Sequence, residues 1–230
     1  MPAGALGRAT FRLLLRTHHI LNENVHVDAA QTRRLLDLLF YRFESEGTSL
    51  FAVLDGARDP LVLNILTSSG AEHDCLFSGR LDPALRTAAP YLVRLLPGSA
   101  LCESLIEQGW GRAWGLYVAA RGDLHQVRRH LRSFLRVETE DRKKLFFRYY
   151  DPRVLRAFLP TCDATQLRQI FGPIERFDME APDSTNLLRF RLIPEPIASA
   201  TLRSWTYSLS GSEAAQDDRG GRLAPTQSSG

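Results

Sequence analysis

The chain has 230 residues, enough for one large domain, or for one domain followed by a tail. Hydrophobic residues form 44% and charged residues 24% of it, which is ordinary for a globular domain that buries its own core. The formal net charge of +3 excludes the strong overall basicity that is typical of many nucleic-acid-binding domains.

The three cysteines, Cys75, Cys102 and Cys162, are far apart in the sequence. There is no CxxC pair, which excludes a zinc ribbon and a thioredoxin-like redox motif, so we expect free thiols in a reducing, cytoplasmic compartment. No stretch of about 18 uncharged apolar residues occurs, so we expect no membrane span. Residues 1–27 lack the apolar core of a secretory signal and are predicted to be an N-terminal extension with a short helix over 9–16.

Helices and strands are predicted to alternate from Asp28 onward. Asp28 begins an amphipathic helix of about 18 residues that ends at Gly47, and a buried strand follows over 50–54. Apolar and aromatic runs predict further strands over 75–77, 91–96, 113–120, 144–150, 174–180 and 187–193. Helical periodicity and capping residues predict helices over 82–88, 99–109, 123–137, 152–159 and 164–171.

Three Asp-Pro pairs share one structural interpretation. They are Asp59-Pro60, Asp82-Pro83 and Asp151-Pro152. An aspartate at the N-cap accepts a hydrogen bond from a free backbone N–H, and a proline at the first helical position lacks an N–H that would have no partner there. We therefore expect each pair to begin a helix, and none of the three aspartates to be catalytic.

The alternation of elements predicts the α/β class, with helices around a mixed β-sheet over residues 28–193. The pattern ends at Pro194, and the Gly- and Ser-rich end of the chain predicts that residues 194–230 are a largely disordered tail. Trp205 and Tyr207 lie just before the Gly-rich part. They are candidates either to dock back on the domain or to anchor a partner.

The sequence contains none of the motifs that usually carry catalysis or a cofactor. A Gly-x-Ser-x-Gly elbow, a Walker loop, a GxGxxG loop and HEXXH are all missing. We therefore predict no catalytic, cofactor-binding or metal-binding residue. The alternative is a hydrolase or nuclease with a non-standard site, which requires several acidic or histidine side chains to converge: Asp55, Asp59, His73, Asp74 and Glu138. A further charged cluster lacks ExK spacing and resembles a solvated turn: Glu138, Glu140, Asp141, Lys143 and Lys144.

Arg128, Arg132 and Arg136 follow one another at i+4 spacing on the predicted 123–137 helix, and would form one ridge there. Such a ridge can meet phosphates or an acidic protein partner, or it can simply face solvent. No aromatic side chains are interleaved with it for base stacking, so a nucleic-acid-binding module is the less favoured alternative.

Five segments, taken together and in order, resemble a known family: LFAVLDGARDP (50–60), CLFSGRLDPALRTAAPYLVRL (75–95), GWGRAWGLYV (109–118), LRSFLRV (131–137) and FFRYYDPRVLRAFLPTC (146–162). They are similar to a bacterial domain-of-unknown-function family whose members act as type VI secretion effector chaperones or adaptors. The resemblance implies a non-catalytic protein that binds a secreted toxic effector and helps load it onto the VgrG spike. It implies no small-molecule substrate and supplies no catalytic residues.

The last of these segments places Arg148, Asp151, Arg153 and Cys162 close together, as an active site would. Asp151 is explained as a helix start, and Cys162 has no basic partner in the sequence that would activate its thiol. We expect this junction to fix the fold, with Asp151 as a cap and Arg148 or Arg153 paired internally.

Overall fold

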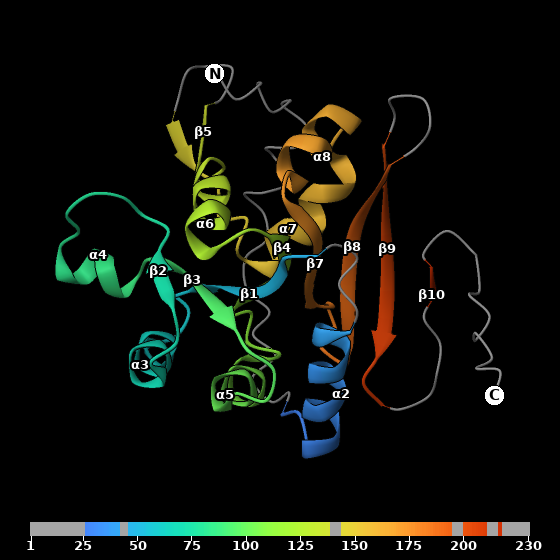
Figure 1. The fold of residues 1–230 in the computed structure, drawn as a ribbon, viewed down its shortest axis with the longest axis horizontal. Coiled ribbons are helices and arrows are strands. Elements are labelled where there is room, and N and C mark those ends of the chain that lie inside the picture. Colours follow the sequence, from blue (N-terminus) through green and yellow to red (C-terminus); the bar gives the residue numbers. More distant parts are fainter. Residues whose placement is uncertain (1–25, 42–45, 139–143, 195–199, 211–215, 218–230) are drawn as a thin grey trace.

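The computed structural model describes residues 26–41, 46–138, 144–194, 200–210 and 216–217. In this part of the chain, one eight-stranded sheet lies between two layers of helices (Figure 1). Its strands are β1 (Thr48–Asp55), β2 (His73–Cys75), β3 (Pro90–Leu95), β4 (Gly115–Arg121), β7 (Ile174–Glu180), β8 (Asn186–Pro194), β9 (Ala200–Ser208) and β10 (Gln216–Asp217). A separate pair consists of β5 (Arg136–Glu138) and β6 (Lys144–Phe146).

One helical layer contains α2 (Ala29–Phe40), α3 (Pro60–Ser69) and α5 (Ala100–Gly109). The other contains α6 (Leu124–Arg132), α7 (Pro152–Phe158) and α8 (Ala164–Phe171). A 3-10 turn over Leu159–Thr161 continues α7. The short helix α4 (Pro83–Thr87) lies beside the β2 edge of the sheet (Figure 1). Two layers of helices around one sheet confirm the α/β class.

The strand directions differ from the mixed sheet that the sequence predicts. The order is β10-β9-β8-β7-β4-β1-β3-β2, and every pairing described in it is antiparallel. The helix α5 connects β3 to β4, which run in the same direction but are not neighbours. β1 lies between them and runs opposite to both, so each pairing is antiparallel. Alternation along the chain therefore predicts the helical layers but not the direction of adjacent strands.

Alternate side chains of β1 pack into two different hydrophobic cores. In β1, Phe51 and Val53 pack toward α6, α7 and α8, while Leu50, Ala52 and Leu54 pack toward α2, α3 and α5. All five are at most 3% exposed. The buried strand predicted over 50–54 is thus confirmed, and its two faces contribute to both cores.

The predicted helix starts are confirmed for all three Asp-Pro pairs. Each aspartate is an N-cap, and each proline occupies the first turn of α3, α4 or α7. The aspartates accept hydrogen bonds from the backbone N–H groups of Leu61, Leu85 and Arg153, at 2.9, 2.8 and 3.0 Å. These residues organise the fold.

The first helix is shorter than predicted, because arginines from distant strands bind its end. α2 ends at Phe40, and Tyr41 is extended. Arg189 donates to the carbonyl of Leu38 at 2.7 Å, and Arg176 donates to the carbonyl of Leu39 at 2.6 Å. Both arginines also donate to Asp178, which is fully buried. This buried Arg176–Asp178–Arg189 network joins α2 to β7 and β8.

The predicted 123–137 helix is also too long. α6 ends at Arg132, and the chain turns at Ser133, whose hydroxyl donates to the carbonyl of His130 at 2.7 Å. The backbone then enters β5, which pairs with β6. Arg136 therefore lies on a strand, and the predicted ridge of three arginines on one helix is wrong.

The prediction that regular structure ends at Pro194 is wrong for residues 200–208. They form β9, which pairs with β8 along its whole length, and Leu209 beyond it is buried. Tyr207 packs against the core, and the guanidinium of Arg189 lies 5.2 Å from the centre of its ring. Trp205 lies 5.9 Å from the guanidinium of Arg191. Both aromatic residues dock back on the sheet, and most of the predicted tail lies outside the described residues.

Most of the predicted N-terminal extension, including the helix over 9–16, also lies outside the described residues. Among the helices that are described, none combines the length and the apolar character needed to cross a membrane.

Candidate functional site

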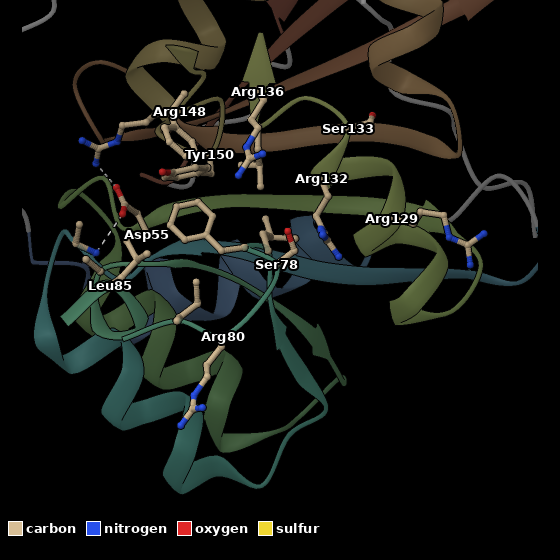
Figure 2. Close-up of a pocket in the computed structure, with 17 residues that line it drawn as sticks. Asp55, Ser78, Arg80, Leu85, Arg129, Arg132, Ser133, Arg136, Arg148 and Tyr150 are labelled. Atoms are coloured by element: carbon tan, nitrogen blue, oxygen red, sulfur yellow. Dashed lines mark hydrogen bonds and ion pairs between the residues drawn. The ribbon is translucent and has the colours of Figure 1, made fainter. Parts of the chain in front are cut away.

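A pocket of about 970 Å³ opens between α4 on one side and α6 with the β5–β6 pair on the other (Figure 2). We call it the arginine pocket, because five arginines line it: Arg80, Arg129, Arg132, Arg136 and Arg148. Its volume is in the range of sites that hold a ligand or several side chains of a partner. The residues that line the pocket come from four separate stretches of the sequence, 55–57, 76–88, 129–136 and 146–150, so only the folded chain brings them together.

The floor and rim of the arginine pocket are apolar. Leu76, Leu81 and Leu135 contribute to the lining. At the rim, Leu85 and Phe146 are 43% and 62% exposed, large values for residues of this size. The ring of Phe146 lies 5.6 Å from that of Phe77 and beneath the guanidinium of Arg136. The pocket thus combines positive charge with accessible apolar surface.

One carboxylate faces this positive charge. Asp55 ends β1 and is fully buried, and its carboxylate accepts from the backbone N–H of Ala57 at 3.1 Å and from Arg148. Figure 2 shows Asp55 and Arg148 pointing toward one another at one end of the pocket. Burial, reinforced by the negative charge of Asp55, raises the pKa of the neighbouring Tyr150 to about 12, so its hydroxyl stays neutral. The Arg148–Asp55 ion pair fixes this wall of the pocket. Because Asp55 is paired with Arg148, it does not form an ion pair with the other four arginines.

Two buried groups hold the backbone behind Asp55. The N–H of Asp55 donates to the carbonyl of Trp114 at 2.7 Å. Glu180 accepts from the N–H groups of Gly111 and Ala113, at 2.7 and 3.2 Å, and burial raises its pKa. The loop over 110–114, which joins α5 to β4 within the quoted GWGRAWGLYV segment, is therefore held by Glu180, a residue that no sequence pattern singled out.

The junction after β6 is structural, as predicted. Asp151 caps α7 and receives two hydrogen bonds from the guanidinium of Arg153, at 2.9 and 2.6 Å. Burial acts to raise the pKa of Asp151, but the hydrogen bonds and charge of Arg153 outweigh it and lower that pKa. Arg148 pairs with Asp55. Both internal arginine pairings of this junction are thus present.

The predicted arginine ridge divides into two parts. Arg132 and Arg136 line the arginine pocket, on α6 and β5 respectively. Arg128 does not: its Nε donates to the carbonyl of Cys75 at 2.7 Å and lies 3.1 Å from a carboxylate oxygen of Asp74. Arg128 is therefore a structural link between α6 and β2, and it does not line the arginine pocket. Arg80 and Arg148 belong to the pocket, although spacing on one helix could not reveal them.

The acidic and histidine side chains of the alternative enzyme site do not gather in the pocket. Asp55 lines it, whereas Asp59 caps α3, Asp74 pairs with Arg128, and His73 contacts the carbonyl of Ala71. Glu138 lies in β5, and its side chain is not described. Within the described residues, no three His, Cys, Asp or Glu side chains lie close enough together to hold a metal ion. Lys144 begins β6, and Glu140, Asp141 and Lys143 lie outside the described residues.

All three cysteines are free thiols, as predicted. Burial raises the pKa of each of them, and burial together with Asp163 raises the pKa of Cys162 to about 12. A thiol with so high a pKa is almost wholly protonated at neutral pH and is a poor nucleophile.

No curated protein and no solved structure matches this chain. A family model described as "Domain of unknown function (DUF4123)" matches residues 50–169. That range is more than half of the sequence and contains every residue that lines the arginine pocket. The chain therefore belongs to the family of domains of unknown function called DUF4123.

Proposed function

We propose that this protein is a non-catalytic, cytoplasmic adaptor of type VI secretion, which binds a toxic effector and helps load it onto the VgrG spike. The proposal starts from the resemblance carried by the five quoted segments. The match to a domain of unknown function over residues 50–169 agrees with the part of the chain in which those segments lie.

The observation that carries the proposal is the arginine pocket itself. It is open, and it combines exposed apolar rim residues with arginines that no carboxylate of the described chain neutralises, apart from the Arg148–Asp55 pair. Arginine and aromatic side chains dominate the binding energy of protein interfaces. Such a surface is suited to a partner protein and would give it both affinity and orientation.

The test is co-expression of the tagged chain with the effector-like protein and the VgrG encoded beside it. The adaptor function predicts that the tagged chain captures the effector. It also predicts that deleting the adaptor gene abolishes delivery of that effector while a second, unrelated effector is still delivered. Unchanged delivery after the deletion would refute the proposal.

A further inference from the structure

We infer that the arginine pocket binds an acidic segment of the effector, with an apolar side chain of that segment seated on Phe146 and Leu85. The inference rests on the proposed adaptor function and names the surface and the chemistry by which it would work. The pocket, its charge and its apolar rim each constrain the occupant.

The charge of the pocket selects an anionic partner. Five arginines and one aspartate line it, a formal excess of four positive charges, although the whole chain carries only +3. The negative end of α6 favours Arg129 and Arg132 in its last turn. It does not account for Arg80, which precedes α4, or for Arg136, which lies on β5. Arginines from separate elements thus line one pocket, and carboxylates are the natural bidentate partners of arginine.

Two of the five arginines, Arg132 and Arg136, point toward the same part of the pocket, whereas Arg80 and Arg129 extend away from it (Figure 2). In Figure 2, Arg132 and Arg136 reach from α6 and β5 toward the segment that carries Ser78. Arg136 also lies over the ring of Phe146, with its guanidinium carbon 5.8 Å from the ring centre. A carboxylate bound by these arginines would therefore lie directly beside the apolar rim.

The apolar lining favours a peptide over a nucleic acid. Single-stranded nucleic acids need free aromatic faces on which successive bases stack. Here Arg136 covers one part of the Phe146 ring, and Phe77 approaches that ring at 5.6 Å. The other apolar residues of the lining are leucines and alanines, apart from Tyr150, which is buried. Leucine side chains offer nothing to a base, but they fit a leucine or phenylalanine flanked by Asp or Glu.

The experiment places a photo-cross-linker in the pocket. Phe146 is replaced by p-benzoylphenylalanine, which keeps an aromatic ring at the rim, and the tagged chain is co-expressed with the effector encoded beside it. Leu96, which is 59% exposed and does not line the pocket, carries the cross-linker in the control. We expect position 146, and not position 96, to cross-link to an effector peptide rich in Asp and Glu. A cross-linked peptide without an excess of acidic residues would overturn the inference.

A charge reversal provides the second arm. The double variant Arg132→Glu/Arg136→Glu is expected to weaken effector capture roughly tenfold or more, because each reversal replaces an attraction by a repulsion. The matched control is Arg33→Glu/Arg34→Glu, two exposed arginines of α2, whose apolar residues pack in the core on the other face of the sheet. Equal capture by the pocket variant and the control, with unchanged thermal unfolding, would refute the pocket while leaving the adaptor function intact.

Two further results separate the possibilities. If the unaltered chain captures no effector, the adaptor function fails, and the inference fails with it. If a 20-nucleotide single strand displaces the effector at lower concentration than a 20-residue polyglutamate, the pocket is a nucleic-acid site. We expect polyglutamate to compete and the oligonucleotide to compete less well.

Discussion

The buried Arg176–Asp178–Arg189 network allows a quantitative test of how this fold is held together. The perturbation is Asp178→Asn, which keeps the shape of the side chain and removes its charge. Asp178 is fully buried, and the side chains of Arg176 and Arg189 are 5% and 6% exposed. Removing the anion leaves two cations in the core without the carboxylate to which both of them donate.

The size of the effect follows from that burial. Removing one partner of a buried ion pair costs about 3–5 kcal/mol of folding free energy. The asparagine oxygen still accepts one hydrogen bond, so we expect about 3 kcal/mol. In a chain of this size, that corresponds to a fall in Tm of about 6–12 °C. Domains are stable by only about 5–15 kcal/mol, so the loss is a large share of the total.

The assay is urea unfolding, which reports the free energy of unfolding and its denaturant slope. Hydrogen exchange of α2 is the second readout, because both arginines bind the carbonyls at its end. The control is Asp37→Asn, an exposed carboxylate on the same helix, which should leave both measurements unchanged. A loss below about 1 kcal/mol, the range of surface ion pairs, would refute the reasoning that these charges are held by burial.

Three further outcomes are expected. Gly115→Ala should destabilise the fold by about 1–3 kcal/mol in urea unfolding, because the added Cβ would lie 2.0 Å from the carbonyl oxygen of Val53. The control is Gly70→Ala, where the space around the Cβ is open and only the positive φ should cost stability, at most about 1–2 kcal/mol. Equal losses in the two variants would refute the clash. Burial lowers the pKa of His130, so as the pH falls the imidazole is protonated in the unfolded chain before it is protonated in the folded chain. The free energy of unfolding should therefore fall as the pH drops below about 6.5. His130→Gln should lessen that fall, and identical pH profiles would contradict the assignment. Cys162, with its pKa of about 12, should react with iodoacetamide at pH 8 far more slowly in the folded than in the urea-unfolded chain, and comparable rates would be incompatible with its burial.

Local chemistry in the sequence predicted the helix starts well. An N-cap depends on a few adjacent residues, so Asp59, Asp82, Asp123, Asp151 and Asp163 could all be assigned from their neighbours. Helix ends were predicted less well, because they depend on distant groups. α2 ends where two arginines from β7 and β8 bind its carbonyls, and no residue near Phe40 in the sequence indicates that the helix ends there.

The same limit explains the candidate site. Period-two alternation in the 187–193 run separates Arg189 and Arg191 from the apolar face, but it does not reveal that α2 covers Arg189. The arginine pocket is lined by four separate stretches of the sequence, and helical spacing predicted only two of its arginines as candidates, Arg132 and Arg136. Arg128 has the same spacing and serves the fold, because Cys75 and Asp74 happen to lie within its reach.

The capping of α2 by Arg189 also constrains the order of folding. The two groups are separated by 151 residues along the chain, so during synthesis the helix emerges long before its cap does. Until β7 and β8 have joined the sheet, the end of α2 has only solvent for its carbonyls and a bare β4 edge beside it. Truncation before Arg189 should therefore leave residues 1–188 with this end of α2 uncapped by Arg189 and more exposed to proteases and to chaperones.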